Sequence, residues 1–309
     1  MTSTTILQVS SLSKTFKNVQ AVQNISFSLQ QGDIFAFLGP NGAGKTTTLR
    51  ILLDIIKADS GTIKWDFDSN ESAFPPSSQI GYLPEERGLY TDQPIIRSLV
   101  YLASIRGMEP SKARKSAFEW LERLDLADRA KEKLQALSKG NQQKIQFVAS
   151  ILHKPAFAIL DEPFSGLDPL NQEKFIEYIR ELNEQGTTIL LSSHQMSLVE
   201  KIAHRVFLIN QGKELFNGSL MDIYKSFGQQ HILDISFASE VPHEKFRLLP
   251  NVENLSPVGT QQVMVTFNPG TELKEILGNL SMMEGITNIK SHNSSLHDIF
   301  LNMVKAHQQ

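Results

Sequence analysis

The stretch Ile34–Thr47 reads IFAFLGPNGAGKTT. Its first part, Ile34–Leu38, is a short apolar run bounded by glycine, which predicts a buried parallel strand. The remainder, GPNGAGKTT, matches the pattern G-x-x-x-x-G-K-[S/T], and we expect the following run Thr48–Ile56 to be helical. Glycines let backbone amides wrap a phosphate at a helix N-terminus. The stretch therefore predicts a nucleotide-phosphate site.

Two side chains of this loop add chemistry to the backbone. Lys45 would place its ammonium on the β- and γ-phosphates, and the Thr46 hydroxyl would ligate a magnesium ion that bridges them. Taken alone, the same pattern also fits a glycine-rich turn between a strand and a helix. The complete expected phosphate-binding set is Gly39, Pro40, Asn41, Gly42, Ala43, Gly44, Lys45, Thr46 and Thr47.

Composition limits the classes of protein that fit. With 309 residues, 40% hydrophobic and 20% charged, the chain is typical of a globular protein with two folded units. The net charge of −3 provides no general basic field, so we expect no nucleic-acid partner. Without cysteine there are no disulfides or thiolate sites, which favours the cytoplasm, and apolar runs of about five residues predict no membrane span or secretion signal.

Short apolar runs separated by helical segments continue to about Gly218, and they predict an α/β fold with a parallel sheet. We place a nucleotide-binding domain at 1–227, with a helical part at about 88–155, and a small α+β accessory domain at 228–309, with the boundary near Gly228. The three later runs expected as strands are Phe157–Leu160, Thr187–Leu191 and Val206–Ile209, the last turning at Asn210, Gln211 and Gly212.

The tail after residue 228 alternates like strands and contains two segments with helical spacing, which predicts a ferredoxin-like α+β unit. Ser295 would cap the last helix, with Asp298 answering three residues later. The expected strand residues are Leu233, Ile235, Phe237, Val263, Val265 and Phe267, and the helical ones are Leu273, Ile276, Leu277 and Leu280.

Two carboxylates end the apolar run in FAILDEP, Phe157–Pro163. In a P-loop ATPase this is the Walker B position, where Asp161 would hold magnesium through water. Glu162 beside it would accept a proton from the attacking water and act as the catalytic base. A solvated or helix-capping pair is the alternative for an isolated Asp-Glu, and the phosphate-binding loop argues against it.

The segment LSKGN, Leu137–Asn141, resembles the signature sequence of ABC ATPases. The resemblance implies that Ser138 and Gly140 contact the γ-phosphate of ATP bound to a second subunit, which implies a dimer. Lys139 and Asn141 depart from the usual glycine and glutamine. A helix cap is the other reading of Ser138.

Further stretches resemble the same family. SGLD, ending in Asp168, resembles the loop that crosses the dimer interface, and His194 in LLSSHQ resembles the histidine that contacts the γ-phosphate. Phe16 occupies the place of an aromatic residue that stacks on adenine, with core packing as the alternative. In IGYLPEERGLY, Glu85 stands where the family carries a glutamine that contacts magnesium, and glutamate adds a negative charge there.

The resemblance to ABC nucleotide-binding subunits covers Phe16 to His194, and GYLPEERGLY, LSKGNQQK and SLHDIFLNMV resemble the bacterial branch that includes sodium and drug exporters. It implies bound ATP and Mg²⁺, a second ATPase subunit, identical or related, and a separately encoded permease. The chain would then lie on the cytoplasmic face of the inner or plasma membrane.

Two other functions would account for part of the sequence. A soluble ABC ATPase acting on nucleic acid or the ribosome usually has two cassettes or a long coiled coil, and the sequence shows one cassette and no sustained heptads. A small-molecule kinase would use the phosphate-binding loop and magnesium, but it gives LSKGN, SGLD and His194 no purpose.

We expect the substitution Glu85→Gln to retain ATP hydrolysis, because the amide still offers an oxygen to the metal. The measurement is phosphate release by the folded variant under saturating ATP and magnesium. Loss of turnover with folding intact would instead mean that the negative charge of Glu85 is itself required.

Overall fold

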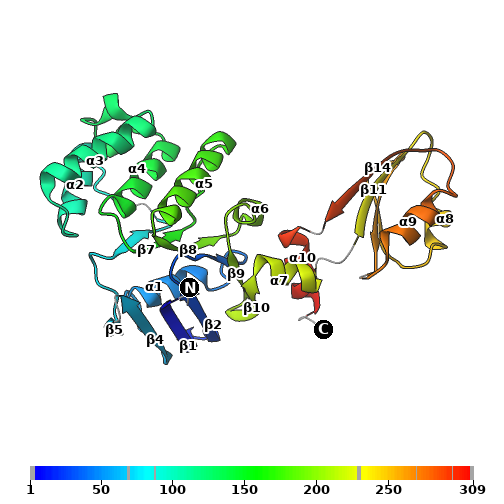
Figure 1. The fold of residues 1–309 in the computed structure, drawn as a ribbon, viewed down its shortest axis with the longest axis horizontal. Helices are drawn as coiled ribbons and strands as arrows, with labels where there is room; N and C mark the ends of the chain where they lie inside the picture. The colour runs from blue at the N-terminus through cyan, green and yellow to red at the C-terminus, as the bar shows by residue number, and fades with distance from the viewer. Residues whose placement is uncertain are drawn as a thin grey trace. The chain divides into compact units, whose positions relative to one another are not determined.

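The computed structural model describes residues 4–67, 70–86, 88–227, 231–268, 270–293 and 295–306. The chain divides into two compact units, Met1–Gly218 and Ser219–Gln309. The sequence placed this boundary near Gly228, which lies outside the described residues. The division falls earlier because the helix α7, Leu220–Phe227, groups with the second unit (Figure 1).

A six-stranded sheet forms the centre of the first unit, in the order β10-β9-β3-β8-β7-β6. The strands β9, β3, β8, β7 and β6 run parallel, and β10 returns beside β9 after the expected turn. Every residue of β3, β7 and β8 is buried, as their apolar runs predict. The bounds are β3 Ile34–Leu38, β6 Ile80–Leu83, β7 Phe157–Asp161, β8 Thr188–Ser193, β9 Arg205–Asn210 and β10 Lys213–Ser219.

A second, antiparallel sheet in the order β2-β1-β4-β5 shares a core with the parallel sheet and with α1. The helix α1 spans Lys45–Leu52, so the predicted range Thr48–Ile56 was wrong at both ends. The helix begins directly at the phosphate-binding loop, and its end is followed by Asp54 in the left-handed region, φ 58°. The strands are β1 Thr5–Phe16, β2 Val19–Gln30, β4 Ser60–Phe67 and β5 Asn70–Ser72.

Helices form a separate layer in the first unit, seen at the upper left of Figure 1. An aromatic cluster of Trp120, Phe147, Phe175 and Tyr178 joins α3, α4 and α5. The helices of this layer are α2 Ile95–Ser104, α3 Pro110–Arg123, α4 Lys139–Ile151 and α5 Pro169–Glu184, with 3-10 turns at Ala127–Arg129 and Leu134–Ala136. The short α6, Met196–Val199, follows β8 outside the layer. No helix in the described part of the chain is long and apolar enough to cross a membrane.

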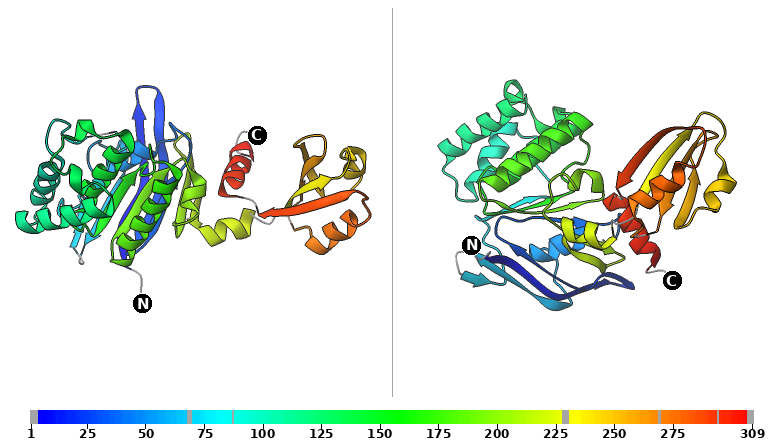
Figure 2. Two further views of the ribbon diagram at one scale, coloured as in Figure 1. Left: turned by 90° about the horizontal axis from the view of Figure 1, so that it is seen from above. Right: turned by 45° about the vertical axis from the view of Figure 1, so that its right-hand side comes forward.

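The second unit contains the element order βαββαβ, with a four-stranded antiparallel sheet β12-β13-β11-β14. This order is that of a ferredoxin-like fold, as the sequence predicted. Figure 2 shows α8 and α9 on one face of the sheet, and the core between them includes Phe246 and Ile276. The bounds are β11 His231–Phe237, α8 His243–Arg247, β12 Val252–Pro257, β13 Gln262–Phe267, α9 Leu273–Leu280 and β14 Ile286–Asn293.

Details of this unit follow the predicted patterns with one exception. The alternating apolar residues of β11 and β13 are buried, as predicted. In α9, Ile276 and Leu280 are buried, but Leu273 and Leu277 are exposed, so the buried stripe of this helix is narrower than predicted. The last helix, α10, spans Leu296–Ala306. The backbone N–H and hydroxyl of Ser295 donate to Asp298, whose N–H donates back to the hydroxyl, so the predicted cap is confirmed.

His153 makes the stability of the first unit depend on pH. Its Nε2 lies 3.0 Å from the carbonyl oxygen of Ile80, and burial together with the charge of Arg106 lowers the pKa of the imidazole from 6.5 to about 4. The fold therefore favours the neutral ring, and the stabilisation is present above pH 6.5 and lost as pH falls towards 4.

We expect the denaturation midpoint of the native chain to fall between pH 6.5 and 4 more steeply than that of His153→Gln. Chemical denaturation followed by circular dichroism at a series of pH values measures this. The exposed His297 provides the control substitution His297→Gln, and equal pH profiles for native chain and His153→Gln would contradict the assignment.

Candidate nucleotide-binding site

The residues singled out in the sequence come together at one edge of the parallel sheet. The phosphate-binding loop follows β3, Glu85 follows β6, Glu162 follows β7 and His194 follows β8. In parallel α/β sheets, ligands bind outside the carboxyl ends of the strands. Four loops that are far apart in the sequence therefore meet because the strands that precede them are parallel neighbours.

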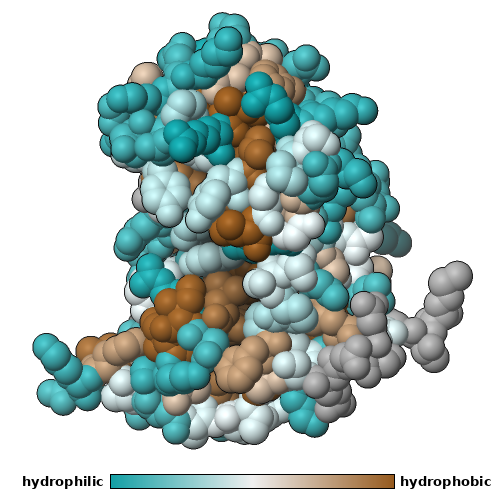
Figure 3. Space-filling view, turned by 90° about the vertical axis from the view of Figure 1, so that its left-hand side faces the viewer, coloured by the Kyte–Doolittle hydropathy of each residue, from teal (hydrophilic) through white to brown (hydrophobic). Residues whose placement is uncertain are grey.

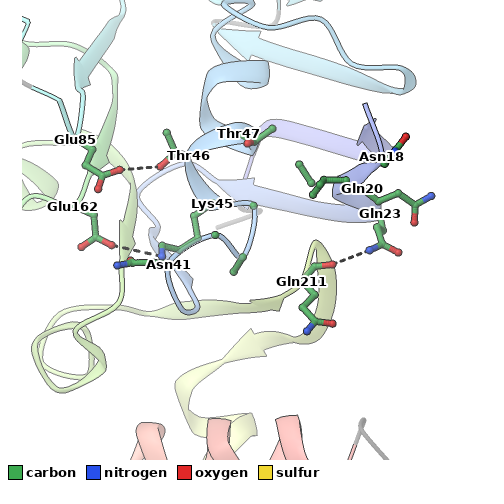
Figure 4. A pocket seen from close by; sticks show the side chains of 15 residues that line it. Asn18, Gln20, Gln23, Asn41, Lys45, Thr46, Thr47, Glu85, Glu162 and Gln211 are labelled. Carbon is green, nitrogen blue, oxygen red and sulfur yellow. Dashed lines mark hydrogen bonds and ion pairs between the residues drawn. The ribbon is translucent and has the colours of Figure 1, made fainter. Parts of the chain in front are cut away.

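A cavity of about 640 Å³ lies over the phosphate-binding loop, a volume suited to a nucleotide. Figure 4 shows Lys45 and Thr46 between Glu85 and Glu162 on one side and a group of amide side chains on the other. In this structure the ammonium of Lys45 donates hydrogen bonds to the carbonyl oxygens of Gly39, at 2.8 Å, and Pro40, at 3.2 Å. The loop is thus closed around the lysine that would bind phosphate.

The backbone of this loop requires glycine at Gly44. Its φ is +105°, and a Cβ atom there would lie 2.2 Å from the carbonyl oxygen of Ala21. Gly42 also has a positive φ, +78°, but a Cβ atom at that position would meet nothing within 4 Å. The close approach of Gly44 to Ala21 fixes the loop against the β1–β2 hairpin.

Glu162 is held at the centre of the site. Its backbone lies in the left-handed region, φ 49°, and its N–H donates to the hydroxyl of Ser192 at 3.1 Å. One carboxylate oxygen lies 3.6 Å from Nζ of Lys45 and the other 2.9 Å from Nδ1 of His194. The Glu162 side chain is 5% exposed and that of His194 is 47% exposed, so the histidine connects a buried carboxylate with the surface.

Asp161, Thr46 and Glu85 form a group of oxygen atoms beside the loop. The Thr46 hydroxyl lies 3.3 Å from Oδ1 of Asp161 and 3.4 Å from Oε2 of Glu85. Burial raises the pKa of Asp161, against the hydrogen bonds from Ser192 and Thr46, which lower it.

These oxygens fit a magnesium ion. Mg²⁺ is bound by carboxylate, hydroxyl and water oxygens, and Oδ2 of Asp161 is buried without a hydrogen-bond partner among the described residues. No group of three or more His, Asp or Glu suited to a metal occurs in the described ranges. The Thr46 hydroxyl would therefore complete the protein's set of oxygen donors.

Several predicted site residues are not among those that line the cavity: Gly39, Pro40, Asp161 and His194, which adjoin its lining, and Ser138, Gly140 and Asp168. The Ser138 hydroxyl accepts a hydrogen bond from the N–H of Asn141 at 3.3 Å and caps α4. Asp168 caps α5 by accepting from the N–H of Asn171 at 3.0 Å. Both residues have the capping role that their types favour, and both stand at helix N-termini, where the backbone attracts anions.

Phe16 lies at the end of β1, is 42% exposed, and does not line the cavity. Because the side chain is this exposed, core packing does not account for it, and the ammonium of Lys14 lies 5.4 Å from the centre of its ring. The cavity is lined on this side by amides that the sequence did not indicate as site residues, Asn18, Gln20, Gln23 and Gln211 (Figure 4).

Ser192 is a further residue that sequence reasoning missed. Its hydroxyl accepts from the N–H of Glu162 and donates to Oδ1 of Asp161, so one side chain orients both carboxylates. The motif LLSSHQ contained it, two residues before His194 at a strand end. The sequence around Ser192 does not show this role, because it depends on β7 and β8 being neighbours in the sheet.

Comparisons with known proteins agree with this geometry. Residues 22–165 match the family model described as ABC transporter. The uncharacterized ABC transporter ATP-binding protein YhaQ of Bacillus subtilis (strain 168) is 38% identical, covering 97% of this chain and 99% of the relative. The linearmycin resistance ATP-binding protein LnrL of the same organism is 33% identical, covering 75% of each.

A solved structure of an ATP-binding subunit of an ABC transporter superposes with a TM-score of 0.65 at 29% identity, covering 72% of this chain and 93% of the other. The chain belongs to the ABC transporter ATP-binding protein family, and it is an ATPase with the P-loop fold of that family. The fold class predicted from the sequence is thereby confirmed.

We expect Gly44→Ala to lose nucleotide binding and stability, because the added methyl group would collide with the Ala21 carbonyl. Gly42→Ala is the matched control: it has space and carries only the cost of a left-handed backbone, about 1 to 2 kcal/mol. Thermal unfolding and titration with a fluorescent ATP analogue compare the two. Equal effects of both substitutions would mean that the contact with Ala21 is unimportant.

Proposed function

We propose that this chain is the ATP-hydrolysing subunit of an ABC exporter, that two copies or related subunits enclose ATP between them, and that they drive a separately encoded permease. The observation that carries the proposal is the division of the expected site. Lys45, Thr46 and Glu162 line the cavity, while Ser138 and Asp168 do not. A second subunit would supply these missing contacts to the phosphate.

The described contacts support a distribution of roles in hydrolysis. Lys45 would exchange its hydrogen bonds to the loop carbonyls for the β- and γ-phosphates of ATP. Glu162 would accept a proton from water as the water oxygen bonds to the γ-phosphorus and the bond to the β–γ bridging oxygen breaks, releasing ADP and phosphate. A bound magnesium ion would neutralise charge on the phosphates.

His194 would couple Glu162 to the γ-phosphate. Its Nδ1 is 2.9 Å from the carboxylate, which leaves the other ring nitrogen for a phosphate oxygen. Because the His194 side chain is 47% exposed, it can respond to what lies outside the cavity. This supports a role in which the loss of the γ-phosphate is sensed at the surface.

ATP would close the dimer only by binding the closed form more tightly than the open one. The N-terminus of α4, with Ser138 and Gly140, would supply this difference by contacting the γ-phosphate of the opposite subunit. Hydrolysis removes the contacted group, and the dimer would reopen. The permease would move with this cycle at the cytoplasmic face of the membrane.

Exposed apolar side chains of the first unit support binding to the proposed permease. Figure 3 shows apolar patches among polar residues on the face that bears α2 and β5. Large side chains more than half exposed in the first unit include Ile55, Phe74, Tyr90, Tyr101 and Ile105. Such patches mark binding surfaces, and export as the direction is supported by the resistance function named for the relative LnrL.

We expect Glu162→Gln to form a stable dimer with ATP and magnesium and to remain monomeric without ATP. The amide keeps the size of the side chain but cannot take the proton, so bound ATP would persist. Size-exclusion chromatography with light scattering measures the mass in each condition.

The same experiment on Glu162→Gln combined with Ser138→Arg provides the control, because a bulky side chain at the N-terminus of α4 would block the contact across the interface. We expect this double variant to bind ATP as a monomer. A Glu162→Gln protein that binds ATP and never dimerises would count against the shared site.

A further inference from the structure

Two glutamines on one side of α4 reach the loops that carry the site carboxylates. Nε2 of Gln143 lies 3.2 Å from the carbonyl oxygen of Pro163 and 3.5 Å from that of Glu162. Nε2 of Gln146 lies 2.9 Å from the carbonyl oxygen of Pro84 and 3.2 Å from that of Glu86. Residues three apart share a helix face, so both amides project from the same side of α4.

Gln146 forms hydrogen bonds with the two residues that flank Glu85. Its side chain is buried, with 4% exposure, and its amide group donates to both carbonyls. In the part of the chain that the structure describes, Pro84, Glu85 and Glu86 make no backbone-to-backbone hydrogen bond of the kind that holds turns and loops.

The surroundings give this loop little other support. A cavity of about 180 Å³ borders it and is lined in part by Pro84, Gly88 and Gln146. The Glu86 side chain is 86% exposed, and its ion pair with Arg50, at 3.7 Å, is a weak surface contact. The amide of Gln146 is therefore the principal buried polar restraint on the backbone around Glu85.

We propose that Gln146 is a positioning residue that holds Glu85 beside Thr46 and Asp161. The inference rests on the proposed function, in which these three oxygens face magnesium. A buried amide that donates to two carbonyls fixes a loop at a set distance from its helix, and without it two partly buried acceptors would lose this partner. The carboxylate of Glu85 then keeps its place 3.4 Å from the Thr46 hydroxyl.

This arrangement makes α4 a rigid link between two parts of the catalytic cycle. Its first turn carries Ser138 and Gly140, the proposed contacts to ATP on the opposite subunit, and its middle carries the amide that holds the Glu85 loop. A movement of α4 when the dimer closes would carry Glu85 with it.

The test is the dependence of ATP affinity on magnesium in the full-length chain. The variant Gln146→Met keeps the length of the side chain and removes both N–H donors, and Gln146→Leu serves as a second variant if the first folds poorly. All proteins carry Glu162→Gln to prevent turnover. Binding of a fluorescent ATP analogue is measured with magnesium and with a chelator. The readout, called the Kd ratio, is the Kd with the chelator divided by the Kd with magnesium.

The matched control removes a comparable amide elsewhere. Nδ2 of Asn183 donates to the carbonyl oxygens of Gly32, at 2.9 Å, and Thr187, at 3.0 Å, outside the site. We expect Asn183→Leu to lower stability and to leave the Kd ratio unchanged. A purely structural role for Gln146 would give the same pattern as this control.

We expect Gln146→Met to reduce the Kd ratio roughly tenfold while leaving the affinity with the chelator unchanged, as is typical when a residue that orients a metal ligand is lost. In a Glu85→Ala background the same substitution should have no further effect. An unchanged ratio, or an equal reduction with and without Glu85, would overturn the inference. A Kd ratio of one in the protein that carries only Glu162→Gln would refute the magnesium site itself.

Discussion

The structure of the first unit depends on two carboxylates that are buried at the end of β7. Asp161 is fully buried and Glu162 is 4% exposed. Placing a carboxylate in such an environment is unfavourable unless positive charge and hydrogen bonds surround it. The ammonium of Lys45 lies 3.6 Å from Glu162, and the hydroxyl of Ser192 donates a hydrogen bond to Asp161. These two groups come from the start of α1 and the end of β8, which are far apart in the sequence. The parallel sheet is what brings those segments to one place.

The glycines and the positive-φ residues of the site belong to the same constraint. Gly44 brings the loop against Ala21, and the turn at Glu162 aims its carboxylate at Lys45. A left-handed conformation is costly for a non-glycine residue and persists where the surroundings impose it, commonly at functional sites. The hydrogen bond from the Glu162 N–H to Ser192 is the contact that imposes it here.

The helical layer is tied to this site by polar contacts as well as by packing. The aromatic cluster anchors α4 to α3 and α5, and the buried amides of Gln143 and Gln146 anchor it to the carboxylate loops. Apolar packing fixes helices closely but without regard to individual atoms, whereas a buried amide specifies which carbonyls it meets. The helix α4 is thereby connected to both carboxylate loops, those of Glu85 and Glu162.

The sequence by itself determined four of the five parallel strands, the phosphate-binding loop, the two carboxylates and the cap at Ser295, because each depends on a local pattern of apolar spacing or turn chemistry. It did not indicate β6, whose four residues include Gly81 and form a shorter and less apolar run. It placed α1 wrongly, because the helix is set by the loop it follows and by the left-handed turn at Asp54. Only the tertiary structure decided the roles of Ser192, Gln143 and Gln146. Their partners lie on loops remote in the sequence, and no local pattern encodes a hydrogen bond between a helix and a distant carbonyl.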